Sequence, residues 1–173
     1  GRTDLHRFTL ARFSTTTRNE IVVDSSVSGR TYYKNASRTQ RDGWEAAWTA
    51  TLPANVDTTL AYTTLKATYA ESFTSSTSTI AAGNVLPGVP ASTLYAEVRW
   101  KHAPSGFSTA LEARRNAKIY VNDANSDAAE AFSVGNLRAG FEQTGPGWKM
   151  SQTLRIDNVA NRRYIGSVIV ADS

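Results

Sequence analysis

The side chains best suited to chemistry are few and scattered along the chain. The two histidines, His6 and His102, lie far apart and lack the spacing of metal ligands. The acids Asp127, Glu130 and Glu142 fall near expected loops or turns and do not form a pair suited to general acid–base catalysis. The chain contains no cysteine, which excludes thiol nucleophiles and thiolate metal sites. We therefore expect no enzyme activity, no metal site and no cofactor.

The composition indicates an ordered chain rich in strand-forming residues. Its 173 residues are 40% hydrophobic and 20% charged, with 7 Tyr, 6 Phe and 4 Trp, which is too apolar for a disordered protein. The net charge of +4 is small and its basic residues are scattered, so we expect no nucleic-acid partner. No apolar run approaches the roughly 20 residues of a transmembrane helix. Membrane strands stay possible, because each one has a much weaker hydropathy signal.

Turn signals alternate between short and long connections. Tight turns rich in Pro and Gly are expected at 52–55, 103–106 and 145–147. Longer polar connections are expected over about 24–30, 72–90 and 122–131. This order predicts an antiparallel up-and-down meander with its tight turns at one end and its long loops at the other. About seven strands are expected, at 5–23, 31–52, 57–73, 92–102, 107–121, 131–143 and 148–170.

Within these segments apolar and polar residues alternate with a period of two, as strands require. Segment 44–52, for example, carries Trp, Ala, Trp, Ala and Leu at its even positions. The apolar phase shifts between Phe8 and Phe13, and again between Tyr62 and Leu65. The second shift predicts a β-bulge, unless the strand assignment there is wrong.

The length of the strands favours a transmembrane β-barrel. Several exceed 15 residues, whereas soluble strands average five or six and membrane strands need roughly 9–11. Aromatic residues on the apolar faces lie within about six residues of the tight turns, where a membrane-interface girdle would place them. The girdle residues that we expect are Trp48, Trp100, Phe107, Phe141 and Trp148.

The faces opposite these aromatics are rich in charge. Glu97, Arg99, Glu112, Arg114 and Arg155 are among the charged residues there. Such a face would be costly in a dry core but can line a water-filled lumen or contact a polar plug. The alternative is a soluble β-sandwich with this face in water, for example a carbohydrate-binding module.

Four segments resemble TonB-dependent outer-membrane receptors of the ferric siderophore type. Segment 33–45 resembles a receptor strand that reads roughly Y-x-N-A-G-x-x-x-x-x-G-x-E. Segments 83–90 (with 94–97 after it) and 120–125 resemble two of the family's loop-to-strand junctions. Segment 156–170 is similar to the V-x-N-L-F-D-x-x-Y stretch near the receptors' C-terminus, with Val159-Ala160 in place of Leu-Phe.

The resemblance implies a bacterial outer-membrane protein that takes up a ferric siderophore or a similar metal complex, energised through TonB. It also implies that residues 1–173 are a partial barrel domain, about 7 strands of a 22-stranded barrel, because the plug domain and the closing strand have no counterpart here. Partners would be the metal chelate, outer-membrane lipid and, through the missing plug, the TonB system.

Two expectations concern individual residues. Ligand pockets in the family use loop aromatics and cations, which makes Arg30, Tyr32, Phe73, Tyr120 and Phe132 the candidate ligand-binding residues. In the last segment, Asn158 interrupts the alternation, and we expect it to support a local irregularity by bonding from its side chain to the backbone.

Overall fold

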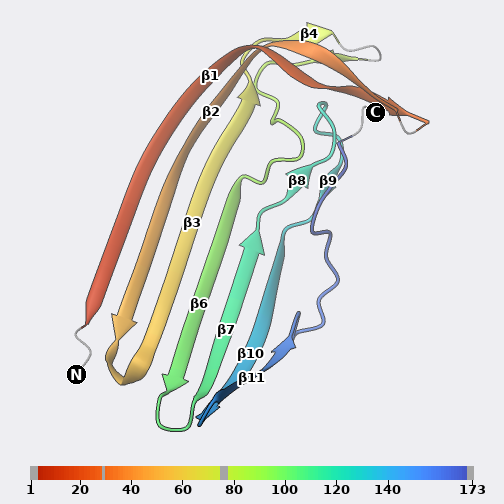
Figure 1. Cartoon of the computed structure of the whole chain (residues 1–173). Helices are drawn as coiled ribbons and strands as arrows, with labels where there is room; N and C mark the ends of the chain where they lie inside the picture. The colour runs from red at the N-terminus through yellow and green to blue at the C-terminus, as the bar shows by residue number, and fades with distance from the viewer. Residues whose placement is uncertain (1–3, 29, 75–77, 171–173) are drawn as a thin grey trace.

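The computed structural model describes residues 4–28, 30–74 and 78–170, and its architecture is one long, curved antiparallel sheet (Figure 1). Apart from one short 3-10 turn, its elements are strands. In chain order they are β1 (Leu5–Val27), β2 (Arg30–Leu52), the 3-10 turn η1 (Pro53–Asn55), β3 (Val56–Tyr69), β4 (Phe73–Thr74), β5 (Thr79–Ile80), β6 (Ser92–His102), β7 (Phe107–Asn116), β8 (Ile119–Tyr120), β9 (Ala128–Ala129), β10 (Phe132–Gly145) and β11 (Trp148–Ile156).

Seven strands form the main sheet in the order β1-β2-β3-β6-β7-β10-β11, and every neighbouring pair is antiparallel. The predicted all-β meander is therefore confirmed. The connections β2–β3, β6–β7 and β10–β11 are tight and lie together at the bottom of Figure 1, whereas the long connections lie at the top. We call these two ends the turn end and the loop end.

The sandwich alternative is not supported by this arrangement. In the described part of the chain, the only other sheets are the two-stranded pairs β4-β5 and β8-β9 at the loop end, so no second layer faces the main sheet. No helix within residues 4–28, 30–74 and 78–170 is long and apolar enough to cross a bilayer.

Strand pairing sorts the side chains onto two unlike faces, because directly opposed residues in a sheet share a face. Phe8 pairs with Trp48, Trp48 with Leu60, and Leu60 with Ala96, which defines the apolar face. Large apolar side chains on this face are open to the surroundings: Phe8 is 74% exposed and Leu154 64% exposed. The other face, which we call the polar face, carries Glu97, Arg99, Glu112, Arg114, Arg138 and Arg155.

Several strand boundaries differ from the prediction. The prediction of a long connection at 24–30 is wrong. β1 extends to Val27 and β2 begins at Arg30, with one register irregularity in their pairing between Val23 and Ser25. The bulge expected between Tyr62 and Leu65 is also wrong: β3 pairs with β2 from Val56 to Tyr69 without a break. The phase changes there because Leu65 packs against an apolar cluster at the loop end.

The segments predicted as single strands at 57–73, 107–121 and 148–170 are each shorter in the structure. The first two end at Tyr69 and Asn116, and the short strands β4 and β8 follow them separately. The third ends at Ile156, and residues 158–170 contain no strand. The prediction for 92–102 coincides with β6.

Asn158 explains where β11 ends, and the side-chain bonding expected of it is confirmed. Its φ of 51° lies in the left-handed region. Its Oδ1 accepts a hydrogen bond from the Arg162 backbone N–H at 2.9 Å, and its Nδ2 donates to the Arg162 carbonyl at 2.8 Å. Its own N–H donates to Asn136 Oδ1 at 2.9 Å. These bonds replace the ladder bonds that a continuing strand would make.

The small apolar core lies at the loop end of the sheet. Its buried members come from β2, β3, β5 and the β5–β6 connection, with Val22, Leu65, Phe73 and Val89 packed against them. The buried residues are Ala36, Ala67, Tyr69, Ile80 and Leu86. The sheet is thus a single layer at its turn end and is covered by packed loops only at its loop end.

Gly43 shows how closely β1, β2 and β3 approach one another below this core. It pairs with Phe13 on β1 and with Leu65 on β3. A Cβ added at Gly43 would overlap both the Phe13 ring and the backbone carbonyl oxygen of Thr64. The ring can rotate away, but the strand backbone cannot move without breaking its ladder.

We expect Gly43→Ala to impair assembly, since overpacking of this kind costs about 1–3 kcal/mol. The readout is the heat-modifiable mobility in SDS gels of the complete barrel that contains this chain. Gly135→Ala is the matched control, because a Cβ there meets only ordinary contacts, with Val159 at 3.5 Å and the Glu112 carbonyl at 3.7 Å. Equal mobility shifts for the two variants would contradict this account of Gly43.

Candidate functional site: the polar face and the loop end

A buried carboxylate joins the two long loops to the sheet. Asp123, in the β8–β9 connection, is 3% exposed. Tyr69 Oη, at the end of β3, donates a hydrogen bond to Asp123 Oδ1 at 2.6 Å. Lys34 Nζ, on β2, lies 3.1 Å from Asp123 Oδ2. An ionised carboxylate is stable at such a site only when it is paired and hydrogen-bonded, so this contact specifies how the loop sits on β2 and β3.

Backbone contacts extend the same junction. Asn84 Nδ2, in the β5–β6 connection, donates to the Asp123 carbonyl at 2.9 Å. Asn125 binds the Val85 peptide from both sides: its Oδ1 accepts from the Val85 N–H at 2.7 Å, and its Nδ2 donates to the Val85 carbonyl at 2.8 Å. The two loops are thereby fixed to each other as well as to the sheet. We call Lys34, Tyr69, Asn84, Asp123 and Asn125 the loop clamp.

A second polar group lies beside the loop clamp, between β1 and β2. Arg41 donates to Glu20 Oε2 at 2.9 Å and to Thr39 Oγ1 at 3.0 Å, and it forms an ion pair with Glu20. The buried Thr39 pairs directly with Tyr69 across β2 and β3. Arg41 holds the pKa of Glu20 below its ordinary value, whereas burial and the hydrogen bond to Asp123 raise the pKa of Tyr69. Tyr69 is therefore a neutral donor at every physiological pH.

The polar face carries a row of compensated charges across β6, β7 and β10. Glu97 pairs directly with Glu112, and Glu112 with Asn136. Asn136 Nδ2 donates to Glu112 Oε1 at 2.7 Å, and Arg114 lies 3.0 Å from the same oxygen. Arg138 lies 3.4 Å from Glu97. The cations offset the repulsion between the two glutamates, so the row forms a hydrophilic surface.

The five predicted ligand-binding residues lie at the loop end but are not gathered at one point. Arg30 and Tyr32 are exposed near the tip of the β1–β2 hairpin. Phe73 packs edge-on against Tyr69 with 4.9 Å between the ring centroids, and Phe132 stacks on Tyr164 with 4.5 Å between the centroids. The Nζ of Lys118 lies 4.6 Å from the centre of the Tyr120 ring. Among the described contacts, no ring stacking or cation–π contact joins two of the five. Their role in binding stays a prediction.

The sequence carries a signal for the loop clamp but does not identify its residues. Segments 83–90 and 120–125 resemble receptor loop junctions, and in the structure they are the segments that bind each other through Asn84, Val85, Asp123 and Asn125. No periodic pattern could have paired Tyr69 with Asp123, which lie 54 positions apart. Across the described residues, no group of three or more His, Asp or Glu side chains is placed to hold a metal ion.

The expected girdle residues share the apolar face. Register places Trp100, Phe107 and Phe141 on it, with Phe107 paired directly to Phe141. Trp148 covers Gly145, its cross-strand partner. Trp48 lies on the same face but in a different hydrogen-bonded row. It pairs with Leu60 on β3, and Leu60 pairs with Ala96, which is four residues from Trp100 on β6. Because membrane strands are tilted, a hydrogen-bonded row is not a level in the bilayer, and the girdle stays a prediction.

A long-stranded meander with one apolar and one charged face is typical of an outer-membrane barrel wall. A family model described as "TonB dependent receptor-like, beta-barrel" matches residues 1–161. The chain belongs to this family. Proteins of this family are outer-membrane receptors and transporters of Gram-negative bacteria and not enzymes, and this chain is accordingly part of an outer-membrane β-barrel.

Two solved receptors have the same fold. The chain is similar to the siderophore receptor PiuA from Acinetobacter baumannii, with a TM-score of 0.74 and 20% identity over 95% of this chain and 23% of that chain. It is also similar to BauA, the ferric preacinetobactin receptor from Acinetobacter baumannii, with a TM-score of 0.71 and 16% identity over 96% of this chain and 26% of that chain. The chain thus spans about a quarter of the length of these two receptors.

The loop clamp yields a direct prediction. Tyr69→Phe removes the donor to the buried Asp123 carboxylate and should cost about 1.5–3 kcal/mol, typical of a hydrogen bond to a charged group. Limited proteolysis of the complete receptor should then cleave the loops at 70–91 and 117–131 faster than in the wild type. Tyr164→Phe is the control, since the Tyr164 side chain is exposed and contributes a ring contact that the change preserves. Unchanged cleavage in Tyr69→Phe would show that the clamp does not hold the loops.

Proposed function

We propose that this chain is part of the wall of a receptor that takes up a ferric siderophore, or a similar metal chelate, with energy supplied through TonB. The observation that carries the proposal is the family match over residues 1–161, together with the fold shared with PiuA and BauA, which are named as a siderophore receptor and a ferric preacinetobactin receptor. The charged polar face and the hydrogen-bonded loop end are consistent with such a wall.

The main sheet contributes about 7 strands of a 22-stranded barrel in this proposal. In the described residues β1 and β11 are the edges of the sheet. Lipid does not tolerate unpaired backbone groups, so in the membrane each edge pairs with a further strand of the same receptor. The row around Glu112 and Arg138 then faces the lumen, where a hydrated plug domain that couples to TonB can contact it.

The loop end captures the ligand. Chelates of ferric iron carry catecholate, hydroxamate or carboxylate oxygens and often aromatic rings, which cationic and aromatic side chains can bind. Arg30 and Tyr32 present such groups on an exposed tip, while Tyr120 and Lys118 form a cation–π pair beside the clamped loops. The loop clamp adds pre-organisation, because loops that are already ordered lose less entropy when a ligand binds.

Uptake of ⁵⁵Fe-labelled chelates tests this function. In a strain that lacks the receptor, the complete wild-type gene should restore uptake of at least one ferric siderophore from a panel, and a second deletion of TonB should abolish it. Arg30→Ala combined with Tyr32→Ala should raise the half-saturating concentration about ten-fold, the effect of losing about 1.4 kcal/mol of binding. Arg162→Ala, at an exposed site after β11, is the matched control and should leave uptake unchanged.

Three outcomes would count against the proposal. Uptake that persists without TonB would contradict the energy source. Failure of every ferric chelate in the panel, with the receptor correctly assembled, would contradict the substrate class. Equal effects of the tip variant and the Arg162 control would remove the assigned role of Arg30 and Tyr32 and leave the substrate class standing.

A further inference from the structure

The chain contains two pairs of adjacent arginines, and they lie in unlike surroundings. Arg114 and Arg115 are on β7, whereas Arg162 and Arg163 follow the end of β11. Two adjacent guanidiniums can be recognised by an endopeptidase whose subsites carry carboxylates. Such an enzyme also needs free backbone around the bond that it cuts, because it binds the peptide through main-chain hydrogen bonds. The surroundings of each pair therefore decide whether it can be cleaved.

The pair on β7 is protected by the main sheet. Arg114 and Arg115 are both paired with β6 on one side and with β10 on the other, so the ladder occupies their backbone groups. Arg114 lies 3.0 Å from Glu112, and its guanidinium carbon is 5.6 Å from the centre of the Tyr95 ring. Cleavage at this pair would require an interior strand of the sheet to leave both neighbours.

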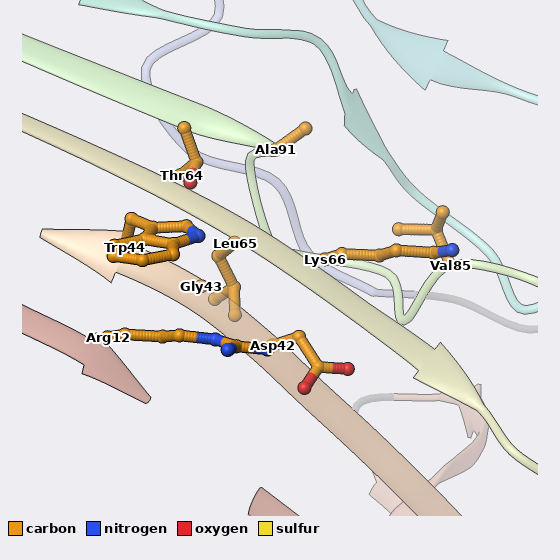
Figure 2. A pocket seen from close by; sticks show the side chains of 9 residues that line it. All are labelled: Arg12, Asp42, Gly43, Trp44, Thr64, Leu65, Lys66, Val85 and Ala91. Atoms are coloured by element: carbon orange, nitrogen blue, oxygen red, sulfur yellow. The ribbon is translucent and has the colours of Figure 1, made fainter. Parts of the chain in front are cut away.

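Exposed basic side chains elsewhere also lie on paired strands. Figure 2 shows two of them around a depression of about 370 Å³: Arg12 extends from β1 toward Asp42, and Lys66 extends along β3 toward Val85. Arg12 pairs with Trp44, and Lys66 pairs with Asp42. Their charged groups are accessible, but the peptide bonds beside them belong to a ladder. An accessible cation is thus not sufficient for cleavage.

Arg162 and Arg163, which we call the exposed pair, lie on open backbone. Residues 159–167 are exposed throughout and contain no strand. In the part of the chain that the structure describes, neither guanidinium forms an ion pair or a ring contact. Among the described contacts, no main-chain hydrogen bond involves residues 163–170. The exposed pair thus meets both requirements, paired cations and free backbone.

The exposed pair lies on the side of the membrane that faces outward. The Val159 N–H donates to the Gly135 carbonyl at 2.8 Å, and Tyr164 stacks on Phe132. Both partners belong to the first residues of β10, at the loop end of the sheet. Figure 1 shows the segment after β11 rising toward that end. The long connections of outer-membrane barrels are extracellular, so the exposed pair is accessible from outside the cell.

One contact restrains the peptide bond between the two arginines. The Arg162 carbonyl, which belongs to that bond, accepts the hydrogen bond from Asn158 Nδ2 at 2.8 Å. During hydrolysis this oxygen must leave Asn158 and accept hydrogen bonds from the endopeptidase. Local opening of an exposed loop costs little free energy. Asn158 therefore slows cleavage and does not prevent it.

We propose that the exposed pair is a cleavage site for a cell-surface endopeptidase specific for paired basic residues. Water is the other reactant: the C–N bond between Arg162 and Arg163 breaks, the hydroxyl of water joins the Arg162 carbonyl carbon, and its proton goes to the Arg163 nitrogen. The products are a new carboxyl group and a new amino terminus. The inference rests on the outer-membrane family of the chain and is independent of what the receptor transports.

Both sides of the cut stay attached to the sheet. Before the cut, the Asn158 N–H is bonded to Asn136. After the cut, Tyr164 remains stacked on Phe132 with 4.5 Å between the ring centroids. The cleaved receptor should therefore keep the mobility of the intact barrel in an unheated SDS gel and separate into two fragments only after heating.

The test expresses the complete receptor in two hosts, one with and one without an outer-membrane endopeptidase specific for paired basic residues. New amino termini are mapped by mass spectrometry. In the first host the receptor should be cut between Arg162 and Arg163, and the pair on β7 should stay intact. Arg163→Gln should reduce this cleavage at least ten-fold, whereas Arg115→Gln, the matched control, should be cut like the wild type. Trypsin added to intact cells should still cut Arg163→Gln after Arg162, which shows that the segment stays exposed.

Asn158→Asp tests the restraint on the scissile bond. Aspartate keeps an acceptor for the Arg162 N–H and tolerates the left-handed backbone, but it cannot donate to the Arg162 carbonyl. Cleavage of this variant should be about five-fold faster than that of the wild type, the effect of losing one hydrogen bond.

Several results would overturn these assignments. The absence of a new amino terminus at Arg163 in the first host, or equal cleavage at both arginine pairs, would refute the site. Equal cleavage of Arg163→Gln and the wild type by the host endopeptidase would show that the pair is not recognised. An unchanged rate in Asn158→Asp would remove the role of the bond to the Arg162 carbonyl. Release of a fragment from the unheated barrel would contradict the attachment of both sides of the cut.

Discussion

The loop end depends on the hydrogen bond and the ion pair that the buried carboxylate of Asp123 forms. A carboxylate that is 3% exposed would be strongly destabilising alone, yet here it accepts from Tyr69 and is paired with Lys34. Its partners come from β3 and β2. The carboxylate is therefore paired only when the β8–β9 connection packs against those two strands. Asn84 and Asn125 then tie the other long loop to the same point. These contacts join the two long loops to each other and to the loop end of the sheet.

Away from the loop end, the described part of the sheet is stabilised by strand pairing and not by a packed apolar cluster. Its turn end is a single layer, and its apolar face exposes side chains such as Phe8 and Leu154 that water would penalise. The exposed apolar surface becomes favourable only against lipid, while the polar face requires water or a polar partner. The alternation along the long strands places an apolar face on one side and a polar face on the other. At the loop end the pattern changes, because Leu65 lies on the polar side of β3 and packs against the apolar core.

Much of this could be predicted from the sequence, because it is encoded locally. Pro and Gly specify the tight turns, period-two alternation specifies the strands, and Asn158 ends β11 through bonds to its own neighbourhood. What could not be predicted depends on distant partners. Polar residues at 24–30 indicate a loop, yet mutual pairing carries β1 and β2 through most of that segment. The contact of Tyr69 with Asp123 has no periodic signature. The signal in the sequence is the resemblance of segments 83–90 and 120–125 to receptor loop junctions.

The charged row on the polar face shows why this face must contact water or a polar partner and cannot contact lipid. Glu97 and Glu112 are directly opposed, which is unfavourable for like charges on neighbouring strands. Arg114 and Arg138 offset that repulsion, but only by bringing two further charges to the same surface. In a dry interior the desolvation of four ions would exceed what their pairing returns. A register slip of one residue would place this row against lipid and the exposed leucines against water, so the alternation itself specifies which side of the wall is wet.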